Sequence, residues 1–206
     1  LAGVARATEM VRQAEVQVAA GVGAQEAILH GEGALTSVPP SDVDALLSRL
    51  AALATSPTQV IEVYERQVAR CRAPADRLTA LARAAQMAAS RGVVDRARGF
   101  FELALSGGVQ EDTINMLEQA ATAGDMHAGA TTLRTILAEA LAGGGQGSRD
   151  GGRTKSALLR RAATIAHRNL GDSERAFKWL GDALVTHVDD ASLDALETLG
   201  RELNTL

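Results

Sequence analysis

The sequence predicts an all-α fold in which antiparallel helix pairs stack into a right-handed superhelical solenoid of about eleven helices. Three observations favour this fold. Alanine is abundant and aromatic residues make up only 2% of the 206 residues, which favours helix over sheet. Apolar residues recur at intervals of three and four positions, as on one face of a helix. Pro or Gly separates most of these apolar segments from the next one.

The first two predicted helices, 2–20 and 24–35, are separated by Gly21-Val22-Gly23. The second of them contains Gly31 and Gly33, and a glycine inside a helix costs about 1 kcal/mol relative to alanine. A close approach by another helix would make these glycines tolerable. We therefore expect this helix to be the least regular of the set.

Proline starts the next three helices. In Val38-Pro39-Pro40-Ser41, Ser41 is the predicted N-cap, and Asp44 three residues later completes a pair that resembles a capping box. Ser56-Pro57 and Ala73-Pro74 place proline at the first helical position, where its missing N–H has no cost. The predicted helices are 41–54, 57–71 and 74–90.

The second half of the chain continues the pattern around one glycine-rich interruption. The predicted helices are 93–105, 112–123, 126–142, 155–170, 172–184 and 192–203. We predict four helix pairs in residues 1–142, a flexible insertion at 143–154, and one further pair with a C-terminal capping helix in 155–206. An unpaired end helix with a solvated outer face is typical of the ends of helical repeat arrays.

One segment of the insertion resembles a phosphate-binding loop. Residues 147–154 nearly match G-x-x-x-x-G-K-[ST], with Arg153 in place of the lysine. Such a loop needs a preceding strand, whereas an alanine-rich helix is predicted here. Arginine is also a planar fork, unlike the compact charge of lysine. We therefore interpret the segment as a flexible linker and predict no nucleotide or other cofactor.

A small–large–small pattern recurs in several of the predicted second helices. It occurs as Ala176, Leu180, Ala183; as Ala97, Phe101, Ala104; and, more weakly, as Gly23, Ala27, Gly31, Ala34-Leu35 closing with Pro39. In this respect the chain resembles the tetratricopeptide (TPR) family, whose unit is about 34 residues of helix–turn–helix. The resemblance implies a stack of helix pairs in which the aromatic residues, Phe101 and Trp179 above all, pack between helices.

Composition limits the class of protein. No apolar run approaches the roughly 18 residues of a membrane span, and no signal-peptide pattern opens the chain. We expect a cytoplasmic protein; because residue 1 is Leu, a removed leader and a fragment of a longer protein stay open alternatives. The single cysteine, Cys71, forms no internal disulfide and is expected to be a small apolar helix residue.

Candidate catalytic and metal-binding groups are scattered. The four histidines form no H-E-x-x-H motif and no pair four residues apart, and we predict no metal site and no enzyme activity. Asp189-Asp190 is interpreted as a loop that caps the last helix. With a pI near 5.6 and the aromatic residues assigned to the core, nucleic-acid binding is not predicted.

The TPR resemblance implies a concave groove, lined by first helices, that binds a peptide or a partner helix. The residues that helical phase places on this wall are Thr79, Arg83, Gln86, Ser90, Asn115, Glu118, Thr122, Arg160, Thr164, His167 and Arg168. We therefore expect a non-enzymatic scaffold or adaptor. Two alternatives stay open: a regulatory or sensory region of a larger enzyme or signalling protein, and a module that self-assembles through its alternating basic and acidic blocks.

Overall fold

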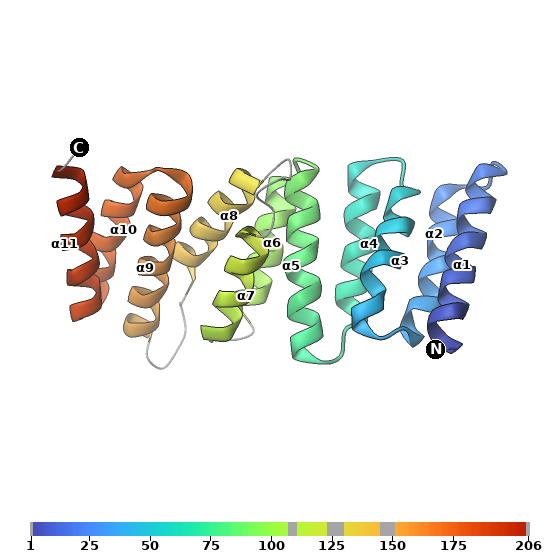
Figure 1. Cartoon of the computed structure of the whole chain (residues 1–206), viewed down its shortest axis with the longest axis horizontal. Helices are drawn as coiled ribbons and strands as arrows, with labels where there is room; N and C mark the ends of the chain where they lie inside the picture. The colour runs from blue at the N-terminus through green and yellow to red at the C-terminus, as the bar shows by residue number, and fades with distance from the viewer. Residues whose placement is uncertain (1, 107–110, 123–129, 145–150, 205–206) are drawn as a thin grey trace. The chain divides into compact units, whose positions relative to one another are not determined.

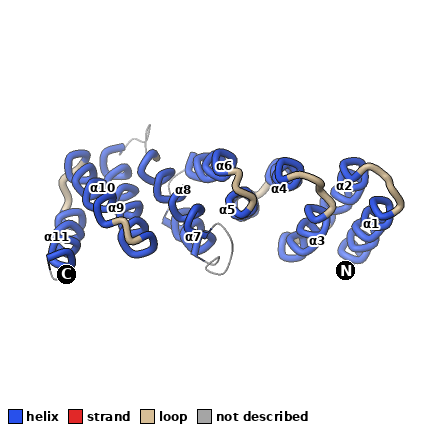
Figure 2. The backbone as a smooth tube through the Cα atoms, turned by 90° about the horizontal axis from the view of Figure 1, so that it is seen from above, coloured by secondary structure: helices blue, strands red, loops and turns tan. Residues whose placement is uncertain are grey.

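The structure, a computed structural model, describes residues 2–106, 111–122, 130–144 and 151–204 (Figure 1). Within these ranges the regular elements are eleven α-helices and one short 3-10 helix, with no strand (Figure 2). The predicted all-α fold with about eleven helices is confirmed. The chain divides between Val93 and Val94 into two compact units, here called the N-terminal and the C-terminal unit.

The N-terminal unit is built from helices that pack mainly on their neighbours in the chain. It contains α1 (Ala2–Ala19), α2 (Ala24–Gly33), the 3-10 helix η1 (Ala34–Ser37), α3 (Pro40–Ala52), α4 (Pro57–Arg70) and α5 (Pro74–Ser90). Helix α1 contacts α2 and α3, and α4 contacts α3 and α5. The largest apolar side chains that are fully buried here are Val11, Leu47, Leu50, Ile61 and Val63.

A close contact between α2 and α3 explains one of the two helix glycines. A Cβ atom on Gly31 would lie 2.5 Å from Cδ2 of Leu50, whose side chain is fully buried. Helix α2 ends at Gly33 and continues as the 3-10 turn η1. The expected close approach is confirmed for Gly31 and wrong for Gly33, where an added Cβ would meet no atom within 4 Å.

The helix starts follow the prolines, with one correction. Ser56 caps α4 by accepting a hydrogen bond from the Gln59 N–H at 3.2 Å, and Pro57 is the first helical residue, as predicted. Helix α3, however, begins at Pro40 and has Pro39 at its N-cap, so the prediction of Ser41 as N-cap is wrong. Proline lacks an N–H and has a preset φ, which lets the N-cap lie two residues earlier.

The same turn ends two of the helices of the N-terminal unit. Gly21 after α1 and Gly92 after α5 have φ values of +88° and +74°, which favour glycine. In each turn the residue after the glycine donates a hydrogen bond to the carbonyl oxygen five residues before it, Val22 to Gln17 and Val93 to Ala88, both at 2.9 Å. This glycine ending is among the commonest ways in which a helix ends.

The C-terminal unit contains α6 (Val94–Ser106), α7 (Glu111–Thr122), α8 (Ala130–Gly143), α9 (Gly151–Leu170), α10 (Ser173–Thr186) and α11 (Asp190–Asn204). Helix α9 packs on α8 and α10, and α11 packs on α10. Helix α9 begins at Gly151, so residues 151–154 of the predicted insertion are helical. Residues 145–150 lie outside the described residues.

The small–large–small residues of α6 and α10 are buried as expected, but the aromatic residues differ in how far they are buried. Ala97, Phe101, Ala104, Ala176, Leu180 and Ala183 are all buried. Trp179 is partly buried against a core cluster that includes Ala163, Ala166 and Leu199. Phe177 is 49% exposed, so the expectation that every aromatic residue packs in the core is wrong for it. Phe177 lies one position after Ala176, and a one-residue step turns a side chain by about 100° around a helix.

Candidate binding pocket in the N-terminal unit

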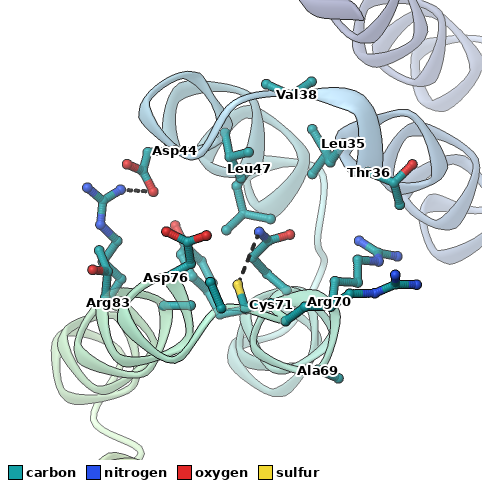
Figure 3. Close-up of a pocket in the computed structure, with 17 residues that line it drawn as sticks. Leu35, Thr36, Val38, Asp44, Leu47, Ala69, Arg70, Cys71, Asp76 and Arg83 are labelled. Atoms are coloured by element: carbon teal, nitrogen blue, oxygen red, sulfur yellow. Dashed lines mark hydrogen bonds and ion pairs between the residues drawn. The ribbon is translucent and has the colours of Figure 1, made fainter.

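A pocket of about 980 Å³ lies between η1 and α3 on one side and the end of α4, the α4–α5 turn and the first half of α5 on the other (Figure 3). All of its lining residues belong to the N-terminal unit. We call it the α3–α5 pocket. Its volume is at the upper end of the range of ligand sites in proteins, about 300–1,000 Å³.

The floor of the α3–α5 pocket is apolar. It consists of Leu35, Val38, Val43, Leu47 and Tyr64, all of which are buried. These side chains come from η1, α3 and α4, whose helical spacing turns them inward. A bound apolar group would extend the core of the unit.

Charged side chains surround this floor. Arg83 of α5 forms an ion pair with Asp44 of α3, and both line the pocket (Figure 3). Partial burial lowers the pKa of the Arg83 guanidinium from its usual value, but an arginine stays charged at neutral pH. Arg72 is an exposed part of the lining, and Asp76 is half-buried. Both signs of charge are therefore present at the rim.

Behind one wall lies a buried carboxylate. Glu32 of α2 is fully buried, and its oxygens accept hydrogen bonds from Arg66 Nε at 2.9 Å and Arg70 Nη2 at 2.8 Å. The two arginines are about one-third exposed, and Arg70 lines the pocket. Arg66 also forms an ion pair with Glu62 at 3.8 Å, so two carboxylates balance the two arginines at this wall.

Two buried polar atoms of the lining residues lack a hydrogen-bond partner among the described residues. They are Nη1 of Arg70, a donor, and Oε1 of Gln67, an acceptor. Leaving a buried donor or acceptor unpaired costs about 1–3 kcal/mol, so such atoms are infrequent in proteins. This donor and this acceptor lie about one helical turn apart. They match a ligand group that has both an acceptor and a donor.

Cys71 was expected to be a helix residue, but it is the first residue after α4. It lines the pocket. Burial and the nearby Asp76 carboxylate raise the pKa of its thiol. The Gln67 side-chain amide donates weakly to Sγ at 3.8 Å, which only partly offsets this. A neutral thiol is a poor nucleophile, so the geometry does not favour a catalytic role.

The structure places two of the predicted contact residues, Thr79 and Arg83, in the lining of the α3–α5 pocket. Gln86 and Ser90 lie farther along α5 and are not part of this lining. Their role in binding stays a prediction.

The predicted contact residues of the C-terminal unit mostly form bonds within that unit. Arg161 of α9 donates to Glu118 Oε2 at 3.2 Å and to Asn115 Oδ1 at 3.1 Å, both on α7. His167 Nε2 lies 2.6 Å from Glu202 Oε2 on α11. Thr164 bonds the backbone of its own helix, and Arg168 is exposed. Thr122 ends α7, and its side chain lies outside the described residues.

Arg160 belongs to a polar cluster at the start of α11. Its Nη1 donates to Asp189 Oδ1 at 2.5 Å, and the same oxygen accepts from the Ser192 backbone N–H at 2.7 Å. The hydroxyl of the buried Ser156 bonds Asp189 Oδ2 at 2.9 Å. The interpretation of Asp189 as a capping residue is confirmed.

No three His, Cys, Asp or Glu side chains in the described part of the chain lie together in a way that could hold a metal ion. None of the helices that the structure describes combines the length and the apolar character that crossing a membrane requires.

Sequence reasoning missed Glu32, Arg66, Arg70 and Gln67. The arginines stand four positions apart on α4, a spacing that puts them on one helix face, but the partner that joins them is 34 and 38 residues away. A long polar side chain between Gly31 and Gly33 was the available signal.

The chain was compared with models of protein families, with curated proteins and with solved structures, and none of the three comparisons found a match.

Proposed function

We propose that this chain is a non-enzymatic interaction module whose α3–α5 pocket binds a short segment of another protein through one apolar side chain. The observation that carries this proposal is the apolar floor of the pocket, framed by polar groups at its rim. Pockets with an apolar base and a few converging polar groups are the usual form of a binding site.

The unpaired polar atoms favour a peptide over a purely apolar ligand. A peptide unit offers one C=O, which can accept from Arg70 Nη1, and one N–H, which can donate to Gln67 Oε1. Both atoms are closed to solvent, so the two side chains must rotate to reach the bound backbone. The three arginines of the lining outnumber its two aspartates, which favours a segment with an acidic residue beside the apolar anchor.

The proposal includes a TPR-like stacking of helix pairs. Two ion pairs support it, because each joins residues 34 positions apart: Glu15 with Arg49, linking α1 to α3, and Glu32 with Arg66, linking α2 to α4. The TPR unit is also about 34 residues long. In this proposal α1 and α3, and likewise α2 and α4, are the equivalent helices of successive pairs.

Selection from a displayed library of short random peptides tests the binding proposal. We expect the enriched peptides to share one large apolar residue with an acidic residue nearby. They should bind Thr79→Trp at least about tenfold more weakly, because the indole would fill the pocket from an exposed position of its lining. Reaction of Cys71 with a bulky maleimide should block the same peptides.

Thr58→Trp is the matched control, since Thr58 is an exposed threonine in the first turn of α4 and does not line the pocket. It should leave the affinity unchanged. Failure to enrich any peptide, or equal binding to Thr79→Trp and Thr58→Trp, would contradict the proposal.

A further inference from the structure

Helix α10 carries an apolar stripe that the described part of the C-terminal unit leaves exposed. Its buried side, Ala176, Leu180 and Ala183, packs in the core. A second stripe consists of Phe177, Gly181, Leu184 and Val185, and continues to Val188 directly after the helix. Phe177 is 49%, Val185 90% and Val188 72% exposed. The spacing i, i+4, i+7, i+8 places the four helix residues on one face, and Val188 follows after His187, where the backbone is already extended.

Gly181 lies at the middle of this stripe, and neither space nor backbone conformation requires a glycine there among the described residues. A Cβ atom there would meet no atom within 4 Å, and the residue does not have a positive φ. Glycine inside a helix costs about 1 kcal/mol relative to alanine. A mid-helix glycine on an exposed apolar face allows the backbone of another helix to approach closely.

We infer that α10 is a self-association surface, on which the α10 helices of two copies of this chain cross in antiparallel fashion at Gly181. This inference is independent of the α3–α5 pocket. A two-fold axis beside Gly181 places Phe177 of one copy against Val185 of the other, since they lie four residues before and four residues after the crossing point. The same patch then serves both copies, as a two-fold interface requires.

The charges beside the stripe fit the same arrangement. Lys178 and Asp182 lie on the same edge of the stripe, three residues before and one residue after Gly181. In an antiparallel two-fold pair the equivalent edges meet, and Lys178 of one copy lies about 3 Å along the axis from Asp182 of the other. The two-fold axis produces this Lys178–Asp182 pair twice, which favours a second copy over an unrelated apolar helix.

The size of the stripe sets the expected affinity. One helix crossing buries much less than the roughly 800 Å² per partner of a standard interface, so the dimer should be weak, with a dissociation constant of roughly 10–1,000 µM. Sedimentation velocity of the whole chain over this concentration range should show a monomer–dimer equilibrium. Because apolar contacts dominate, the dimer should persist at about 1 M salt, where surface charges are screened.

Two substitutions locate the surface. Gly181→Ala should weaken dimerisation about tenfold or more, because the added methyl group separates the crossing helices. In the monomer it should leave the melting temperature unchanged or raise it, which excludes misfolding as the cause. Val185→Lys should abolish the dimer. Because Val185 is 90% exposed, the substitution should change the stability of the monomer very little.

Each has a matched control. Gly99→Ala changes an exposed glycine in the middle of α6 whose Cβ would also meet no atom within 4 Å, and Val16→Lys changes a valine of α1 that is 55% exposed. Neither should affect dimerisation. Lys178→Asp should weaken the dimer about three- to tenfold at low salt, and the exchanged pair Lys178→Asp with Asp182→Lys should restore it.

A monomer at every concentration would overturn the inference. It would also be overturned if high salt dissolved the dimer, which would point to the charge blocks, or if the Gly99 and Val16 variants weakened the dimer as much as the Gly181 and Val185 variants.

Discussion

Arg70 of α4 donates a hydrogen bond from Nη2 to Oε2 of Glu32 on α2 at 2.8 Å, and the carboxylate that it reaches is fully buried. Arg66 supplies the second cation. We expect the double variant Arg66→Met with Arg70→Met to lose about 3–5 kcal/mol of unfolding free energy, because it leaves a buried charge unpaired. Each single variant should lose about 1–2 kcal/mol, since one arginine stays on the carboxylate.

Urea denaturation of the three variants measures this difference. The loss in the double variant should exceed the sum of the two single losses, as expected for two groups that share one partner. If the loss in the double variant equals the sum of the two single losses, the two arginines stabilise the protein independently of each other.

Gly31 and Leu50 provide a second test of packing in the N-terminal unit. Gly31→Ala should lower the unfolding free energy by about 1 kcal/mol, because the clash with the buried Leu50 costs about 1–3 kcal/mol and exceeds the gain in helix propensity. Gly33→Ala, two residues later in the same helix, meets no atom within 4 Å and should stabilise the protein instead. Chemical denaturation of both variants checks the opposite signs.

Phe101 of α6 and Phe177 of α10 should respond differently to replacement by alanine. Phe101→Ala removes a fully buried ring and should cost about 3–5 kcal/mol. Phe177→Ala removes a ring that is half exposed and should change the unfolding free energy by less than about 1 kcal/mol. Equal losses in thermal or urea denaturation would show that Phe177 is buried in the folded chain.

Asp189 should make the docking of α11 sensitive to acid. Burial raises the pKa of this carboxyl, but hydrogen bonds from the Ser192 N–H and from Ser156 outweigh burial, so the pKa lies below its usual value. A lowered folded-state pKa stabilises the fold above the unfolded value of about 3.9, and this contribution is lost as the pH falls through the folded-state pKa. Asp189→Ala should cost about 1–2 kcal/mol at pH 7.

The cost of Asp189→Ala should shrink as the pH falls below about 3.9, because the wild-type carboxylate is then protonated as well. Denaturation of both proteins at pH 7 and at pH 3 gives the comparison. A cost that stays constant with pH would mean that the ionised form of Asp189 contributes nothing to stability.

The helices could be predicted from the sequence because their signals are local. The spacing of Ala97, Phe101 and Ala104 and the prolines at 57 and 74 act within a few residues, and the structure confirms them. The N-cap of α3 was misplaced by two residues, from Pro39 to Ser41, because both positions suit a helix start and only the backbone decides between them.

The site could be predicted only in part. Thr79 and Arg83 were found because helical phase places them on one face of α5. Glu32 and its arginines were not found, because their pairing depends on how α2 lies on α4 and leaves no local pattern. Phe177 shows the same limit, since a one-position step around α10 separates an exposed ring from the buried core.

The most direct test of the account is a methyl NMR titration of the whole chain with a peptide enriched by the library selection. The account predicts that the methyl signals of Leu35, Val38, Val43 and Leu47 shift with the peptide, while those of Leu117 and Leu137 in the core of the C-terminal unit stay in place. Peptide binding that leaves the four pocket signals unchanged would contradict it.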